Sequence, residues 1–364
     1  MKKSIGLKVG ALLLSLFLSQ LSLLAQDDGQ VVNTAAPFLN IMPESRAGGM
    51  GDAGVATSPD MNSQALNPAK YAFIDSDMGV SLSFTPWLRK LVNDINMYYT
   101  SFYYRIDKMS TVSASLRYFS MGSITFNDEQ GNTLATGNPN EFALDAAYSR
   151  ALSKKLSGAV AFRYIRSDIS NGYSDGGNIQ AGDAFAADVA FYFKTPVKID
   201  RNDAEFSAGI NLSNLGSKMS YDGVNKMSLP TNLKLGVGWF MELDKYNSVS
   251  FALDGNRLLT PAIENINEDG TEGEKASELN KITFSLGAEY WYDKQFAIRA
   301  GYFHEDESLG NRKFASAGAG LKFNMFQLDA SYIIPLVQNN PLANTMRFTL
   351  SFDLSEMSGG RKRR

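Results

Sequence analysis

Few residues of this chain could carry catalysis. It has no cysteine and a single histidine, His304, which Glu305 and Asp306 follow. The lack of cysteine excludes thiolate nucleophiles, thiolate metal sites and disulfides. A Ser-His-Asp hydrolase would have to use His304, but a lone histidine in a loop is usually an exposed polar residue. We therefore expect no catalytic residue, no metal site and no cofactor.

A glycine-rich run near the N-terminus is the second candidate. It spans Arg46 to Gly54 and precedes the turn-forming pair Asn67-Pro68. A nucleotide-binding loop would need Lys-Ser/Thr after the glycines and a strand–turn–helix around them, and this run has neither. Glycines also allow tight backbone packing and positive φ, so the pattern favours a compact structural motif. Its residues are Arg46, Gly48, Gly49, Gly51, Asp52, Asn67 and Pro68.

From Gly79 onward, apolar and polar residues alternate with a period of two, as in β-strands. The last clear stretch sets Met346, Phe348, Leu350 and Phe352 against Arg347, Thr349, Ser351 and Asp353. A soluble sandwich and a membrane barrel both give this pattern. The length of the strands, about ten residues or more, is enough to cross the hydrocarbon when tilted. Each strand also has a continuous apolar side, so we favour a membrane barrel.

In a membrane barrel the polar set faces the lumen. The charged residues expected there are Arg117, Asp145, Arg163, Asp188, Lys234, Glu242, Asp254, Glu289, Arg299, Lys322, Asp329, Arg347 and Asp353. Mixed charge of this kind suits a closed, ion-paired interior better than a path for acyl chains.

Counting the alternating stretches predicts an even number of strands, as single-chain bacterial barrels require. The fourteen stretches lie near 79–87, 95–106, 110–126, 141–151, 156–168, 183–195, 204–214, 231–243, 248–258, 281–292, 295–304, 314–324, 326–336 and 344–354. Connections after even strands are mostly short, such as Asp107-Lys108, although the sixth is expected to run from Pro196 to Asp203. Connections after odd strands are long, such as 127–140 and 259–280. Short turns lie in the periplasm and long loops outside, which places both termini in the periplasm.

The composition agrees with an exported barrel. Of 364 residues 44% are apolar, and a mean hydropathy of -0.19 argues against a helical multi-span protein. The net charge of -3 gives no reason to expect nucleic acid as a partner. Lys2, Lys3 and Lys8 precede the apolar run Leu12 to Leu24, as in a signal peptide. We expect a signal peptide at 1–25, a hatch segment at 26–78, the barrel at 79–354 and a basic tail at 355–364.

The hatch segment carries a family resemblance. The stretch "APFLNIMPESRAGGMGDAGVATSPDMNSQALNPAKYAF" (Ala36 to Phe73) resembles the opening of the PorV family of the type IX secretion system. That family belongs to the wider FadL-like group, in which the Asn67-Pro68-Ala69 turn is shared. The ending "RFTLSFDL" (Arg347 to Leu354) extends the likeness. The resemblance implies an all-β membrane protein, a fourteen-stranded antiparallel transmembrane β-barrel with an N-terminal hatch or plug. Many such barrels end on an aromatic residue, whereas this chain continues into a polar tail.

The resemblance also implies a role. PorV-like proteins capture secreted cargo through its C-terminal β-sandwich domain and shuttle it from a large translocon barrel to a sortase-like attachment complex. The chain would then sit in the outer membrane of a Gram-negative bacterium, among outer-membrane lipid. Candidate binding loops are 127–140, 169–182, 215–230 and 259–280, with Tyr173, Tyr221 and Asp222 as candidate cargo-binding residues.

Two alternatives stay open. A FadL-like transporter of hydrophobic small molecules would need an apolar pocket beneath the loops and a hatch that opens. A lipopolysaccharide deacylase, a role linked to the same family, would need a nucleophile and His304 as its base.

Overall fold

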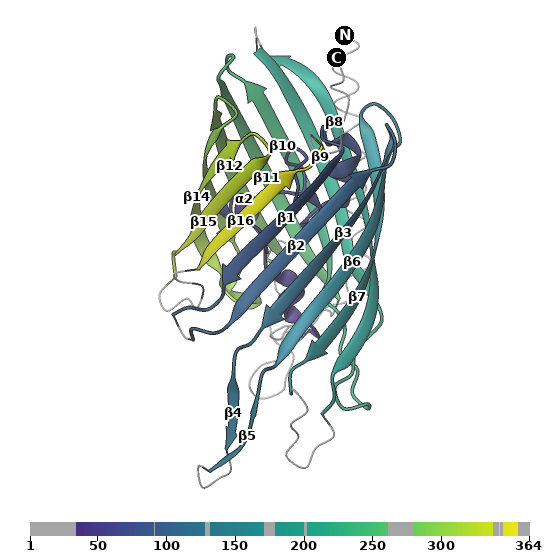
Figure 1. The fold of residues 1–364 in the computed structure, drawn as a ribbon, viewed down its shortest axis with the longest axis vertical. Helices are drawn as coiled ribbons and strands as arrows, with labels where there is room; N and C mark the ends of the chain where they lie inside the picture. Colours follow the sequence, from purple (N-terminus) through teal and green to yellow (C-terminus); the bar gives the residue numbers. More distant parts are fainter. Residues whose placement is uncertain are drawn as a thin grey trace.

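The computed structural model describes residues 34–90, 92–127, 132–170, 179–199, 202–260, 280–337, 342 and 345–355. Within them fourteen antiparallel strands close into a barrel, in the order β1-β16-β15-β14-β13-β12-β11-β10-β9-β8-β7-β6-β3-β2 (Figure 1). The predicted fourteen-stranded antiparallel barrel is confirmed. None of the helices in the described residues combines the length and the apolar character that crossing a membrane requires.

Each expected strand overlaps one strand of the wall. The wall strands are β1 (Met78–Pro86), β2 (Asn96–Arg105), β3 (Ser110–Ser120), β6 (Asn140–Ala151), β7 (Leu156–Asp168), β8 (Gly182–Ile199), β9 (Asn202–Gly216), β10 (Thr231–Glu242), β11 (Asn247–Thr260), β12 (Ile282–Tyr292), β13 (Phe296–His304), β14 (Lys313–Phe323), β15 (Phe326–Pro335) and β16 (Met346–Asp353). The barrel closes where β1 pairs with β16, from Gly79 opposite Asp353 to Phe84 opposite Phe348. All other wall strands pair with the wall strand before or after them in the chain. The pairing of β1 with β16 is therefore what closes the barrel.

The prediction of a third strand at 110–126 is wrong in its length, because the observed strand is shorter. The wall strand β3 ends at Ser120, and the chain then forms β4 (Ile124–Asn127) and β5 (Thr133–Gly137), which pair only with each other. Gly122 lies between β3 and β4 with a φ of 77°, a left-handed conformation that breaks an extended strand. Figure 1 shows this hairpin standing away from the barrel wall at the end that carries the long loops.

The expected long connection from Pro196 to Asp203 is also wrong. β8 continues to Ile199 and β9 begins at Asn202, with Pro196 opposite Glu205. The partner strand β7 begins at Leu156, opposite Phe193, and the last backbone bond on that side runs from Lys194 N–H to the Lys155 carbonyl. Beyond Lys194, β8 pairs with β9 only. A strand with one free edge tolerates a proline, which has no N–H to donate.

The two faces of the wall differ as the alternation predicts. In β6 the burial alternates along the strand, with Asp145 buried and Leu144 52% exposed. Large apolar side chains such as Phe162 and Ile298 likewise stay exposed on the outside. An exposed apolar belt around a barrel with buried serines and charges is the arrangement of a membrane-spanning barrel.

Residues 34–77, here called the lumen segment, lie inside the barrel. They form η1 (Pro37–Asn40), α2 (Ser45–Gly49), η2 (Ser63–Ala65) and η3 (Pro68–Phe73), drawn in purple in Figure 1. The carboxylate of Glu44 caps α2 by accepting the backbone N–H groups of Arg46 and Ala47 at 2.6 and 2.7 Å. The segment starts near the long loops, where Ala35 N–H donates to the Ser228 carbonyl. It ends at the short turns, where β1 begins.

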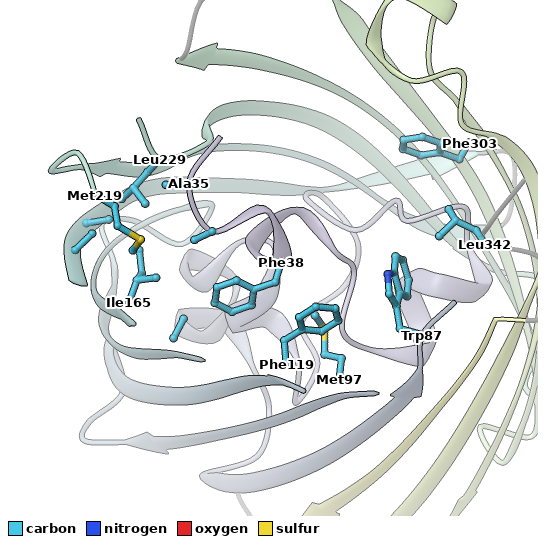
Figure 2. Close-up of a cluster of buried hydrophobic side chains, with 14 of the residues drawn as sticks. Ala35, Phe38, Trp87, Met97, Phe119, Ile165, Met219, Leu229, Phe303 and Leu342 are labelled. Carbon is cyan, nitrogen blue, oxygen red and sulfur yellow. The ribbon is translucent and has the colours of Figure 1, made fainter. Parts of the chain in front are cut away.

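An apolar layer lies in the lumen at the loop end of the barrel (Figure 2). Phe38 of the lumen segment stacks on Phe119 of the wall at 6.4 Å between ring centroids, and Phe303 stacks on Phe314 at 4.9 Å. Trp87 lies in the same cluster. The alternation did not predict this layer, because it assigns only polar side chains to the lumen.

Candidate functional site: the sealed lumen and the outer rim

Arg46 is the centre of an ion network between the lumen segment and the wall. Its guanidinium contacts Glu289 on β12 at 2.8 Å and Asp60 at 2.6 Å. Glu289 is also bound by Arg299, which reaches Asp329 on β15, each at 2.7 Å. Glu289, Arg299 and Asp329 are at most 4% exposed. Buried charges of this kind are tolerated because each has a partner of opposite sign.

The carboxylates of the lumen segment differ in their environment. Burial, with the neighbouring Asp60 adding to it, raises the pKa of Glu44 to about 7. Against the effect of burial, the charges of Lys70 and Arg46 hold the pKa of Asp60 below its ordinary value. Asp60 is therefore an anion at neutral pH and can hold Arg46 in place.

A second ion network lies nearer the loops. Arg163 on β7 binds Asp145 on β6 and Asp188 on β8, the latter at 3.0 Å. It also contacts Asn214, whose φ of 61° marks a bulge where β9 shifts register against β8. Arg117 on β3 donates to the Leu39 carbonyl of the lumen segment at 2.7 Å.

The structure thus confirms the expected lumen charges, although two of them are exposed and not buried. Glu242 lies at the turn end with its side chain 49% exposed, 3.8 Å from Lys294. Lys322 is exposed as well. Both residues follow the alternation, but they lie within the last two positions of their strands, where the lumen opens to solvent.

The glycines of the motif allow the lumen segment to approach the wall closely. Gly51 has a φ of 68°, and a side chain there would lie 2.6 Å from the backbone of Tyr302. Gly49 faces Gly318, and a Cβ on Gly48 would lie 2.8 Å from Arg347 Cδ. Asp52, which follows Gly51, lies 3.3 Å from the Arg347 guanidinium. The backbone contacts and positive φ require glycine at position 51, while positions 48 and 49 leave little room for a side chain.

Asn67 and Pro68 position the second half of the segment. The Asn67 amide donates to the carbonyls of Val55 at 2.9 Å and Phe191 at 3.0 Å, and its oxygen accepts the Ala69 N–H at 3.1 Å. Pro68 begins η3, and Ser149 on β6 donates to its carbonyl at 2.7 Å. Asn67 therefore caps η3, and Asn67 and Pro68 together fix the start of η3 to the wall.

Hydrogen bonds join the lumen segment to strands all around the barrel. The wall side chains involved include Ser101, Ser113, Ser149, Ser157, Ser207, Asn211, Asp254, Glu289, Ser316 and Thr349. Asp254 alone accepts the Gly54 and Val55 N–H groups at 2.6 and 2.9 Å. The segment is held on all sides and not only at its ends.

Two polar cavities lie on either side of the segment. One of about 290 Å³ lies toward the loops, lined among others by Asp52, Lys234, Asp254 and Arg312. The other, of about 240 Å³, lies toward the turns beside Asp60 and Lys322. Both are lined by charges of either sign, which suits water better than a hydrophobic ligand.

The comparison with protein families agrees with this architecture. The family model described as type IX secretion system protein PorV matches residues 24–265, which include the whole lumen segment and the strands up to β11. The chain belongs to the PorV family. No curated protein matches its sequence significantly.

Solved structures similar to this PorV-family chain are β-barrels of low sequence identity. The P. putida toluene transporter TodX is 10% identical and superposes with a TM-score of 0.51, over 86% of this chain and 98% of the transporter. The Ralstonia pickettii toluene transporter TbuX is 12% identical, with a TM-score of 0.49 over 87% of this chain and 99% of the transporter. The first likeness supports the fold and nothing more. Together with the family, the fold makes the chain an outer-membrane β-barrel of a Gram-negative bacterium.

Two candidate cargo-binding residues of this PorV-family protein, Tyr221 and Asp222, lie in a long loop and have structural contacts of their own. The Tyr221 hydroxyl contacts Ser167 Oγ at 3.0 Å, and its ring packs against the apolar layer. Asp222 accepts the N–H groups of Val224 and Asn225, and these bonds lower its pKa to about 2. Both side chains shape their loop, and their role in binding a partner stays a prediction.

Other predicted features fall outside the described residues. They are Tyr173, the signal peptide, most of loop 259–280 and the basic tail after Ser355. His304 is described and ends β13, where its Nδ1 lies 3.3 Å from the Tyr302 hydroxyl. A tyrosine hydroxyl beside the imidazole is not the serine and carboxylate that a hydrolytic triad requires.

Proposed function

We propose that this protein is a cargo shuttle of the type IX secretion system. Its outer rim binds the C-terminal β-sandwich domain of secreted proteins and carries them from a large translocon barrel to a sortase-like attachment complex. The observation that carries this proposal is the lumen segment, whose hydrogen bonds to the wall close the interior. A closed barrel leaves its surfaces, and above all its loops, as the place where partners bind.

The β4–β5 hairpin is the best described docking element of that rim. Each of its strands pairs only with the other, so each keeps one free edge. Ile124 and Leu134 on the hairpin are 39% and 50% exposed. A free strand edge binds another strand through main-chain hydrogen bonds, and a β-sandwich domain presents such edges. If the rim that carries the hairpin faces the outside of the cell, the short turns and the end of β16 lie in the periplasm.

Removal of the hairpin tests the proposal. Met121 N–H donates to the Pro139 carbonyl, so the hairpin base is already closed and 124–137 can be replaced by Gly-Gly. We expect the purified variant to keep its barrel and to lose at least tenfold in affinity for a recombinant cargo C-terminal domain. The matched control replaces Asp244 and Lys245, in a tight turn at the other end, by Asn-Gly. Equal loss in both variants, or none in either, would contradict the proposal.

Uptake of hydrophobic small molecules is the second candidate function, and no observation favours it. The apolar layer beneath the loops is packed with the side chains of Phe38, Phe119 and Phe303. The cavities on either side are lined by charged residues. The toluene transporters share the fold with this chain at 10–12% identity, and sharing a fold does not transfer a substrate.

A further inference from the structure

A basic cluster occupies one sector of the barrel rim at its turn end. Lys108 lies in the turn between β2 and β3, while Arg150, Lys154 and Lys155 lie at the end of β6 and in the turn to β7. The two turns are neighbours, because β3 pairs with β6 and Ala151 N–H donates to the Met109 carbonyl at 2.7 Å. All four basic side chains are exposed. We call these four residues the basic cluster.

The basic cluster has more basic residues than carboxylates to neutralise them. Asp107 is the only acidic residue in the stretches 104–112 and 148–158. Its Oδ1 already accepts the backbone N–H groups of Met109 and Ser110 at 2.6 and 2.9 Å. No ion pair among the described residues involves a member of the basic cluster. The Arg150 guanidinium instead donates to the Tyr148 hydroxyl at 3.2 Å.

The cluster lies where the lipid-facing surface ends. Along β6 the outward column runs through Leu144 and Tyr148, both exposed, to Arg150. The turns themselves are flanked by exposed apolar side chains. Ile106, Met109, Leu152 and Leu156 are 36–54% exposed. Apolar side chains of this kind enter the acyl region, while lysine and arginine extend from them toward the head groups.

The rim on the far side of the barrel has the opposite balance. Lys245 and Lys294 lie in the turns after β10 and β12, accompanied by Glu242, Asp244 and Asp293. Lys294 Nζ is 3.8 Å from Glu242. This sector has two lysines and three carboxylates, whereas the basic cluster has four basic residues and one carboxylate, Asp107. The excess of positive charge is therefore a property of the β2–β7 sector.

We propose that the basic cluster binds the phosphate of an anionic glycerophospholipid head group in the leaflet at the turn end. A guanidinium can offer two parallel N–H donors to phosphate oxygens, and lysines next to it add charge. Under the proposed orientation this leaflet is the periplasmic one. The site extends the function proposed above and does not depend on which cargo the rim binds.

The test measures lipid bound to the full-length protein, delipidated in mild detergent, by native mass spectrometry. The probes are dioleoyl phosphatidylglycerol, the zwitterionic phosphatidylcholine of the same chains, and lipid A. We expect phosphatidylglycerol to bind more tightly than phosphatidylcholine. Lys154→Gln/Lys155→Gln should weaken phosphatidylglycerol binding about tenfold, since each lysine near a membrane surface adds to the attraction of anionic lipid.

Lys245→Gln/Lys294→Gln is the matched control, because it removes the same charge from the compensated sector. It should leave phosphatidylglycerol binding within about twofold, since those lysines are already balanced by carboxylates. Equal losses in the two double variants would overturn the proposal, as would equal binding of the two phospholipids. Tighter binding of lipid A at the basic cluster would assign it to the outer leaflet and would also overturn the proposal.

Discussion

Glycines lie on both sides of the closest contact in the lumen. On the segment, Gly51 has positive φ and donates its N–H to Ser316 Oγ at 2.9 Å. On the wall, a side chain at Gly301 would overlap the Gly51 nitrogen, and one at Gly287 would lie 2.6 Å from Met50 Cβ. The contact is therefore backbone against backbone, which only glycine permits on the wall side.

This contact predicts a sharp cost for one added methyl group. Gly301→Ala should lower the free energy of unfolding by about 1–3 kcal/mol, because neither backbone can move away without breaking hydrogen bonds. Urea unfolding in detergent micelles, followed by tryptophan fluorescence, measures the change. Gly255→Ala is the control, since a Cβ there meets only Ile282 Cγ2 at 3.6 Å. A similar change in both variants would show that the close contact carries no special weight.

At the scale of elements, the lumen segment has little secondary structure of its own. Its helix α2 has five residues and its 3-10 helices have three to six. Helices this short are not stable in isolation. The wall supplies the missing stability, for example where Thr349 on β16 accepts the Ser45 N–H at 2.9 Å and donates to Ser45 Oγ at 3.1 Å.

That pair of hydroxyls allows a test of whether the segment moves. The chain has no cysteine, so Ser45→Cys/Thr349→Cys introduces the only two thiols. We expect the disulfide to form readily and to leave cargo secretion unchanged, because a segment held all around the wall does not need to leave it. Each single cysteine variant serves as a control for the substitutions. Secretion that falls in the double variant and recovers on reduction would show that the segment must move.

At the scale of the whole molecule, the barrel is a closed body. The apolar layer lies at the loop end, the Arg46 network anchors the middle, and polar cavities of about 290 and 240 Å³ flank the segment. A fourteen-strand lumen is too wide for wall side chains alone to fill. The N-terminal segment therefore completes the core that the wall cannot form.

A closed barrel is expected not to conduct ions. The purified protein should give no stable open-channel current in planar lipid bilayers, because the two cavities share no lining residue and the segment lies between them. Deleting residues 34–73 should produce conducting barrels, or barrels that fail to fold if the segment is needed for assembly. For the second case, Gly301→Val offers an alternative, since it displaces the segment while keeping the chain. Steady conductance of the unmodified protein would contradict a sealed lumen.

The sequence alone determined the wall. The alternation seen at Met346 to Asp353 recurs along the chain, because each strand has one side toward lipid and the other toward the lumen. The strand count and the identity of most lumen charges followed from that period. The exceptions were local: Gly122 ended β3 early, and Pro196 continued a strand whose other edge was free.

The tertiary structure decided what fills the barrel. Arg46 and Glu289 are 243 positions apart, and no period in the sequence joins them. Gly51 meets Gly301, and Phe38 meets Phe119, only because strand register and barrel closure bring those wall positions to the same depth. Alternation specifies which side of a strand a residue faces. It does not specify height or partner across the lumen, which depend on the tilt and stagger of all strands together.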